Sequence, residues 1–397
     1  MSVTFPRGFR AAGVTAGLKP SGRADLGLLV ADEARSAAGL FTTNAFAAAP
    51  VRLSRRRVSD GLARAVVVNS GQANAGTGAA GDRDAESTTA AVAGALGLDP
   101  SVLLACSTGV IGEPLHVDEY LAAVPSLVGD LSPDGGDAFA EAILTTDTVP
   151  KQATADRGAF RVGGCAKGVG MIAPDLRLAT MLVFVTTDAP IPPSDIGRLA
   201  TDVLEPAFES LTVDGCSSTN DTVLLFASGA AGGEAVVPGS SAWDQVVDAM
   251  NEVAASLLRQ LADDAEGASH TLLVEVSGAR TDADARVVAR AVAESLLVKT
   301  ALFGGDPNPG RLLQAVGAAG VPFQPLRVDA VIGDVPVIAA GEVATLYLAA
   351  GAEAAREAIS AHDVVIGVSI GDGPGASRAL GVDLSYDYVK INAEYTT

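Results

Sequence analysis

Short apolar runs recur along the chain and predict a series of buried strands. Most of these runs are rich in β-branched residues and apolar on both faces, a pattern typical of strands that are covered on both sides. The predicted strands cover residues 65–69, 102–106, 180–186, 222–228, 271–277, 364–369 and 388–392.

Between these runs, apolar residues at every third or fourth position predict amphipathic helices. The clearest helix covers residues 241–261. Ser241 and Thr281, each followed three residues later by an aspartate, fit capping boxes that open helices. An alanine-rich helix is expected from about residue 84 to Gly97. Strands and helices in this order predict an α/β fold with layered sheets covered by helices.

The composition predicts a large core and an acidic surface. Apolar residues make up 48% of the 397 residues and charged residues 19%, which excludes global disorder. Lys and Arg number 27 against 47 Asp and Glu, and the formal net charge of −20 would repel nucleic acids and anionic membranes. The N-terminus has no secretory signal pattern, and the apolar runs are too short to cross a bilayer. We therefore expect a cytoplasmic protein that acts on small metabolites.

Metal and nucleotide sites are not predicted. The three cysteines form no CxxC pair and the three histidines lie far apart, which argues against a zinc cluster, a disulfide framework or a histidine-based triad. Gly168, Gly170 and Ala173 match a dinucleotide fingerprint, with Asp188 20 residues after Gly168. However, Pro174 follows at once and the next predicted element is a strand, so the helix that would bind a pyrophosphate is missing.

Thr180 stands at the start of a predicted strand, after a loop rich in Gly and Pro. If the Ala179–Thr180 bond is cut, the new α-amine has an ordinary pKa of about 7.7–8 and can act as the base for the neighbouring hydroxyl. This is one way to make threonine a nucleophile. The alternative is that a β-branched residue simply suits a strand.

Polar turns after other strands leave two interpretations open. Thr108 and Gly109 could offer a hydroxyl and an N–H to an oxyanion hole, or the glycine could serve only a tight turn. The segments 69–76, 217–222 and 306–311 are rich in amide and hydroxyl side chains that could hold a substrate or only close turns.

Taken together in chain order, these segments resemble the ornithine acetyltransferase family, also described as ArgJ-type glutamate N-acetyltransferases. The matching segments cover nearly the whole chain: GFRAAGV at 8–14, FTTNAFAAAPV at 41–51, NSGQANAGTG at 69–78, STGVIG at 107–112, TTDTVPK at 145–151, AKGVGMIAP at 166–174, ATML at 179–182, SSTNDT at 217–222, DPNPGR at 306–311 and NAEYTT at 392–397.

The resemblance implies an α/β fold with two stacked β-sheets between helices, similar to N-terminal-nucleophile hydrolases. It implies self-cleavage between Ala179 and Thr180 into an α chain, 1–179, and a β chain, 180–397, which assemble as an α2β2 heterotetramer. The implied reaction is a ping-pong transfer of acetyl from N-acetyl-L-ornithine to L-glutamate in arginine biosynthesis, with no metal or organic cofactor.

The resemblance also assigns roles to residues in the matching motifs. Thr180 is the expected nucleophile, and Thr108 with Gly109 the expected oxyanion hole. The substrate-binding residues, in addition to Thr180, are expected to be Thr146, Lys167, Glu266, Asn392 and Thr397. Use of acetyl-CoA as a second donor stays open. So do two alternatives: an amidohydrolase or aminopeptidase on the same scaffold, in which water replaces glutamate, and a paralogue that does not cleave itself.

Overall fold

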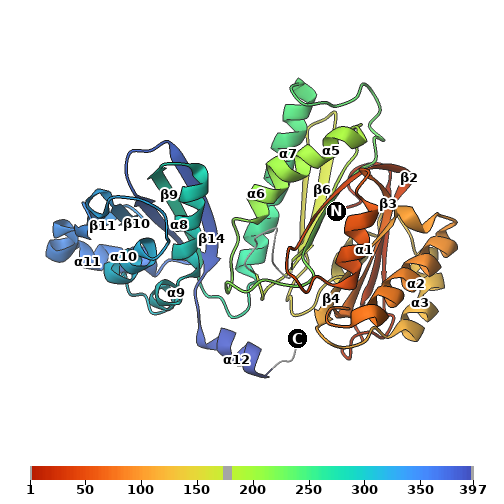
Figure 1. The fold of residues 1–397 in the computed structure, drawn as a ribbon, viewed down its shortest axis with the longest axis horizontal. Coiled ribbons are helices and arrows are strands. Elements are labelled where there is room, and N and C mark those ends of the chain that lie inside the picture. Colours follow the sequence, from red (N-terminus) through yellow and green to blue (C-terminus); the bar gives the residue numbers. More distant parts are fainter. Residues whose placement is uncertain (1, 173–180, 395–397) are drawn as a thin grey trace. The chain divides into compact units, whose positions relative to one another are not determined.

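A computed structural model describes residues 2–172 and 181–394, without the side chains of residues 34, 35 and 350. Ala179, Thr180 and Thr397 therefore lie outside the described residues. The chain forms two compact units (Figure 1). Unit 1 consists of Met1–Glu209 and Cys216–Leu261, and unit 2 of Ser210–Gly215 and Ala262–Thr396.

Unit 1 contains an eight-stranded sheet with the order β4-β3-β2-β8-β7-β6-β5, in which β1 also pairs with β2. Its strands are β1 (Phe9–Val14), β2 (Leu26–Phe41), β3 (Leu62–Gln72), β4 (Leu103–Val110), β5 (Lys151–Asp156), β6 (Arg161–Lys167), β7 (Leu182–Thr187) and β8 (Thr222–Ala227). The long β2 pairs with β3 near its start and with β8 over its last six residues, with a register shift between. Such a shift bends a strand, and β2 thereby links two sheet layers.

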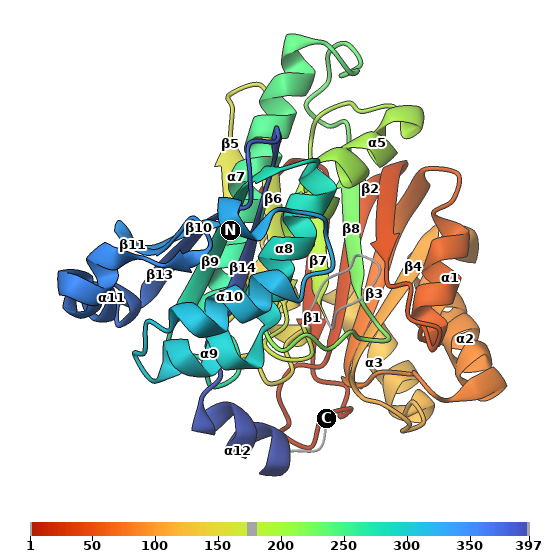
Figure 2. The same cartoon turned by 60° about the vertical axis from the view of Figure 1, so that its left-hand side comes forward.

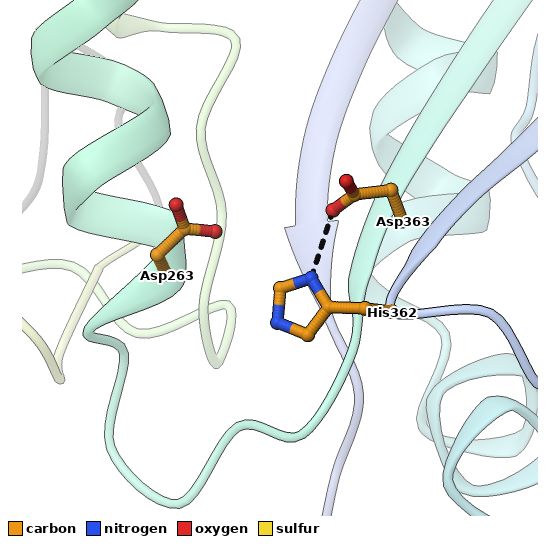
Figure 3. Close-up of side chains that lie close together, drawn as sticks. All are labelled: Asp263, His362 and Asp363. Atoms are coloured by element: carbon orange, nitrogen blue, oxygen red, sulfur yellow. Dashed lines mark hydrogen bonds and ion pairs between the residues drawn. The ribbon is translucent and has the colours of Figure 1, made fainter.

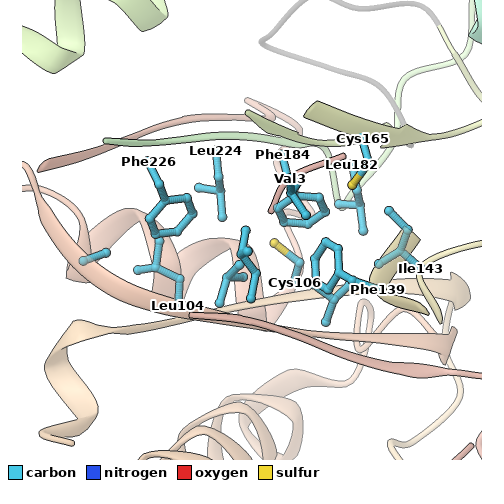
Figure 4. Close-up of a cluster of buried hydrophobic side chains, with 14 of the residues drawn as sticks. Val3, Leu104, Cys106, Phe139, Ile143, Cys165, Leu182, Phe184, Leu224 and Phe226 are labelled. Carbon is cyan, nitrogen blue, oxygen red and sulfur yellow. The ribbon is translucent and has the colours of Figure 1, made fainter. Parts of the chain in front are cut away.

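The main core of unit 1 lies between these two layers (Figure 4). Val66 and Leu104 reach it from β3 and β4, while Phe184 and Leu224 reach it from β7 and β8. Because successive strand residues point to opposite faces, Val67 packs instead in a second core on the outer face of β3. The predicted pair of stacked layers is confirmed, and one hydrogen-bonded sheet supplies both.

Helices cover the outer faces of both layers. Figure 1 shows α2 and α3 beside one part of unit 1 and α7 beside another. The second core includes side chains of α2 and α3, whereas Val253 and Leu257 of α7 lie against Gly164 of β6. The helical segments are α1 (Ala49–Arg57), α2 (Gly78–Leu96), η1 (Pro100–Val102), α3 (Val117–Gly129), α4 (Gly136–Ala142), α5 (Pro193–Leu199), η2 (Ala200–Leu204), α6 (Glu205–Phe208) and α7 (Ser241–Asp263).

Unit 2 contains a six-stranded sheet with the order β12-β11-β10-β13-β9-β14, in which β13 and β9 run parallel. Leu272, Val274 and Val276 of β9 are buried in its core, while Glu275 between them is exposed. Side chains from α8 to α11 share this core, so helices cover one face of the sheet (Figure 2). The elements are β9 (Thr271–Ala279), α8 (Asp282–Glu294), α9 (Leu296–Phe303), α10 (Pro309–Gly317), η3 (Pro325–Arg327), β10 (Asp329–Ile332), β11 (Val335–Ala339), β12 (Glu342–Val343), η4 (Tyr347–Gly351), α11 (Ala352–Ile359), β13 (Asp363–Ser369), β14 (Gly375–Val382) and α12 (Tyr386–Glu394).

The predicted elements correspond to observed ones with one clear exception. The strand predicted at 388–392 is wrong, because these residues lie in α12. The Ser385 hydroxyl accepts a hydrogen bond from the Tyr388 amide at 3.2 Å, a capping contact that outweighs the β-branched pattern. At α7 the capping hydroxyl is that of Ser240, which accepts from the Trp243 amide, and not that of Ser241 as predicted.

Candidate active site

Lys167 connects the two sheet layers of unit 1. It is the last residue of β6, and its Nζ donates to Thr145 Oγ1 at 2.7 Å and to Thr108 Oγ1 at 3.1 Å. Thr108 lies on β4 in the other layer, and both Lys167 and Thr108 are buried. The structure thus brings together two predicted site residues that are 59 positions apart in sequence.

The hydrogen bond from Lys167 decides what the Thr108 hydroxyl can do. A hydroxyl has one proton to donate and two lone pairs that accept. Because Lys167 donates to Thr108 Oγ1, the hydroxyl proton of Thr108 stays available for another acceptor. This chemistry suits the oxyanion-hole interpretation, in which Thr108 donates to a developing negative charge.

Asp147 places a negative charge behind Lys167. Its Oδ1 accepts from Lys151 Nζ at 2.6 Å and from the Gly168 amide at 2.8 Å, and its Oδ2 lies 3.9 Å from Lys167 Nζ. Burial alone would raise the pKa of this carboxyl, but the charges of Lys167 and Lys151 hold the pKa of Asp147 below its ordinary value. The buried Asp147 carboxylate is therefore shared by the buried side chains of Lys151 and Lys167.

The threonine that contacts Lys167 is Thr145, the neighbour of the predicted Thr146. Thr145 accepts the hydrogen bond from Lys167, and its amide donates to Asp147 Oδ2 at 3.1 Å. The motif 145–151 gave no signal to separate Thr145 from Thr146. The substrate contact assigned to Thr146 stays a prediction.

Gly109 is a glycine because two strands approach closely. Its φ is +124°, and a Cβ at this position would lie 2.2 Å from the carbonyl oxygen of Gly71, its partner on β3. A side chain therefore fails for both conformational and steric reasons. The close approach fixes the main chain beside Thr108, and the role of the Gly109 N–H in an oxyanion hole stays a prediction.

The polar segments at 69–76 and 217–222 bond to one another. Asn220 Nδ2 donates to the carbonyl oxygens of Ala73 at 2.6 Å and Ser107 at 2.8 Å. The Ser107 hydroxyl in turn donates to Asn69 Oδ1 at 2.5 Å. Of the two interpretations left open for these segments, closing the loops is the one observed for Asn69 and Asn220, and this network supports the end of β4.

The register of β6 and β7 places the start of β7 beside Lys167. Leu182 pairs with Lys167 across the two strands, and Leu182 follows Thr180 by two residues in sequence. The amide of Met181 donates to Asp221 Oδ1 at 2.6 Å. Asp221 is fully buried, and burial raises its pKa well above the ordinary value. Sequence reasoning passed over Asp221 as part of a polar turn.

In unit 2 the structure brings together Glu266 and Asn392. Asn392 Nδ2, on α12, donates to Glu266 Oε2 at 3.0 Å. Gly267 has a φ of +65°, and a Cβ there would lie 2.3 Å from the Tyr388 amide nitrogen, so only glycine allows the loop to lie against α12. The sequence did not predict this contact between Glu266 and Asn392, because it predicted a strand at 388–392 where the structure has α12.

The dinucleotide interpretation remains rejected. No helix follows Gly168 within the described part of its segment, up to residue 172. Asp188 is already paired, because its Oδ2 accepts from Arg7 Nε at 2.7 Å and its Oδ1 from the Arg161 amide at 2.8 Å. The fingerprint match is therefore a coincidence of glycine spacing.

Within the described residues, one group has the composition of a metal site: Asp263, His362 and Asp363 (Figure 3). Their ligand atoms lie within 4.8 Å of one another, and His362 Nδ1 is 2.9 Å from Asp363 Oδ1. All three side chains are exposed, where water readily solvates acidic groups.

Among the described helices, none combines the length and the apolar character that a membrane span requires.

Comparison with known proteins decides the family. A sequence model of the ArgJ family matches residues 10–397. The chain belongs to the ArgJ family. The arginine biosynthesis bifunctional protein ArgJ of Thermosynechococcus vestitus is 45% identical over 411 residues, which cover 100% of this chain and 98% of the relative. The resemblance found in the sequence is thereby confirmed.

Two solved structures extend the comparison. The ArgJ bifunctional protein of Bacillus halodurans is 37% identical, covers 53% of this chain and 98% of that chain, and has a TM-score of 0.51. The ornithine acetyltransferase of Mycobacterium tuberculosis, solved in complex with ornithine, is 45% identical, covers 44% of this chain and 95% of that chain, and has a TM-score of 0.43. The Bacillus halodurans structure, with its TM-score above 0.5, confirms the mixed α/β fold expected of an ArgJ-family chain.

Proposed function

We propose that this ArgJ-family enzyme is a self-processing acetyltransferase of arginine biosynthesis, which moves acetyl from N-acetyl-L-ornithine to L-glutamate. The observation that carries the proposal is the contact of Lys167 with Thr108, made beside the strand that follows Thr180 in sequence. A buried ammonium group and a hydroxyl with a free proton suit an amide substrate that bears a carboxylate.

The proposed mechanism has two half-reactions. The α-amine of Thr180 takes the proton of the Thr180 hydroxyl, and the oxygen attacks the acetyl carbonyl, with Thr108 and Gly109 stabilising the oxyanion. The C–N bond then breaks, and ornithine leaves with the proton from the Thr180 ammonium. In the second half-reaction the neutral amine of glutamate attacks the acetyl ester and gives a proton to the Thr180 α-amine. The ester C–O bond then breaks, and this proton passes to the Thr180 oxygen as acetylglutamate leaves.

The proposed self-cleavage gives chains 1–179 and 180–397, assembled as an α2β2 heterotetramer in the cytoplasm. The coverage of the Bacillus halodurans chain supports the cleavage. That chain matches over 98% of its own length but over only 53% of this one. The proposed β chain is 218 of 397 residues, or 55%. Light scattering on the purified protein tests the assembly, and a mass of one α and one β chain would contradict it.

Intact-mass spectrometry tests the processing. Wild type is expected as two fragments, the second beginning at Thr180, and Thr180→Ala as one chain. Thr180→Ser should still cleave, because it keeps a hydroxyl, and Thr201→Ala, at an exposed helix position, controls for general effects. An uncleaved wild type would contradict the proposal and favour a non-processing paralogue.

A transfer assay tests the substrates. With N-acetylornithine and labelled glutamate, label is expected in acetylglutamate, with initial rates that follow ping-pong kinetics. Release of free acetate at the same rate without glutamate would favour the amidohydrolase alternative instead. Replacing the donor by acetyl-CoA in the same assay tests a second activity, which the description of the relatives as bifunctional supports.

A further inference from the structure

Residue 181 is held by both of its main-chain groups. Its amide donates to Asp221 Oδ1 at 2.6 Å, and its carbonyl oxygen accepts from the Thr222 amide at 3.0 Å. Thr222 is the first residue of β8, which pairs in parallel with β7 from Leu182 onward. The main-chain bond from Thr222 belongs to the β7–β8 ladder, and the Asp221 side chain holds the next main-chain group toward Thr180, the amide of residue 181.

The other carboxyl oxygen of Asp221 has no hydrogen-bond partner among the residues that the structure describes. Asp147 in the same unit is a useful contrast, because two lysines and the amides of Thr145 and Gly168 surround its oxygens. A buried carboxylate needs such partners to keep its charge. Asp221 has backbone contacts with Met181 and Ser218 and lies within reach of the Lys167 charge, but burial outweighs these and one carboxyl oxygen is buried without a described partner, an arrangement that favours the protonated acid.

We propose that Asp221 is a positioning residue that works as a neutral carboxylic acid: it holds the amide of residue 181, which directly follows the proposed nucleophile Thr180 in sequence, and this contact is needed for Thr180 to act. The inference rests on the proposed function of Thr180. A neutral acid accepts with one oxygen and donates with the other, the same pattern that asparagine offers in nearly the same volume. Alanine offers neither and leaves the Met181 N–H without its acceptor.

The test compares Asp221→Asn with Asp221→Ala. Asp221→Asn is expected to cleave fully and to keep kcat within about fivefold of wild type, with an unchanged pH profile, because geometry is preserved. Asp221→Ala is expected to remain largely uncleaved or to lose at least about 100-fold in kcat with little change in KM, because a shift near 1 Å has such effects. An infrared band of a protonated carboxyl should be present in wild type and absent from Asp221→Asn.

Asp188→Asn is the matched control, since Asp188 is equally buried but follows the opposite end of β7. It should lower the melting temperature without affecting cleavage. If folded Asp221→Asn is as inactive as Asp221→Ala, an ionised carboxylate is required and the proposal is wrong. It is also wrong if Asp221→Ala cleaves and turns over like wild type. If Asp221→Ala does not fold, the infrared band and the pH profile of Asp221→Asn decide. An uncleaved wild type would instead refute the proposed function, and the infrared band would still report the state of Asp221.

Discussion

The Lys167 ammonium nitrogen lies 3.1 Å from the Thr108 hydroxyl oxygen, across two sheet layers. The same nitrogen lies 3.9 Å from Asp147 Oδ2, so the charge on Lys167 is both buried and compensated. Two residues that the family resemblance assigned to different tasks, substrate binding and oxyanion stabilisation, are thus coupled by one hydrogen bond. A change at Lys167 should affect both tasks.

Lys167→Met should reduce kcat/KM for acetyl transfer by at least about 100-fold, because a charge-assisted partner of the oxyanion donor and the carboxylate-binding group are lost together. Folding should be affected less, since Lys151 continues to pair with Asp147 at 2.6 Å. Lys151→Met is the matched control, with the larger loss of stability and the smaller loss of transfer. The reverse order in transfer assays and thermal melts would contradict the assignment of Lys167.

Gly109→Ala should lower the free energy of unfolding by about 2–4 kcal/mol, from an unfavourable φ and a Cβ pressed against Gly71. Transfer activity should fall with it, because the main chain beside Thr108 must move. Gly112→Ala is the control: its φ is +87°, but a Cβ there meets no atom within 4 Å. Denaturant unfolding of both variants measures the difference, and equal losses would show that the close approach to Gly71 does not matter.

Asp147→Asn should destabilise unit 1 by about 3–5 kcal/mol, because it leaves the buried Lys151 ammonium without its counter-charge. The pKa of Asp147 is lowered in the folded state. Its contribution to stability is therefore present above the unfolded pKa of about 3.9 and is lost as pH falls through the lower folded pKa. Urea unfolding at several acidic pH values should show a shallower loss in Asp147→Asn than in wild type. Restored stability in Asp147→Asn/Lys151→Met would confirm that the charge imbalance is the cause.

Burial of Lys299 in unit 2 should make the free energy of unfolding depend on pH in the alkaline range. Its Nζ donates to the Val382 carbonyl oxygen, and burial lowers its pKa from 10.5 to about 8, although Asp214 and Asp383 act in the opposite direction. Between these two values the unfolded chain binds more protons than the folded one, so the free energy of unfolding should rise with pH, by at most about 3 kcal/mol from this group.

Lys299→Met should flatten that rise between pH 8 and 10.5. Lys390→Met, an exposed lysine on α12, should leave it unchanged. Lys19, whose pKa is also lowered to about 8, contributes in the same pH range and is present in both variants. Equal slopes for Lys299→Met and wild type in denaturant titrations would mean that Lys299 keeps an ordinary pKa.

The sequence by itself determined the family, the class of fold and several of the buried strands and amphipathic helices. Doubly apolar runs such as 65–69 and 222–228 correctly predicted buried strands, and the ordered motifs correctly predicted the family. The prediction of a strand at 388–392 was wrong. The β-branched pattern is local, whereas the cap from Ser385 and the close approach of Gly267 depend on the fold.

Only the tertiary structure decided which polar residues meet. Lys167 and Thr108, like Glu266 and Asn392, are far apart in sequence, and no periodicity relates them. The contact of Lys167 with Thr145, and the difference in electrostatic surroundings between Asp147 and Asp221, likewise depend on which groups the fold brings together. Donor counts and burial are properties of packing, so they become visible only when the two sheet layers close on each other.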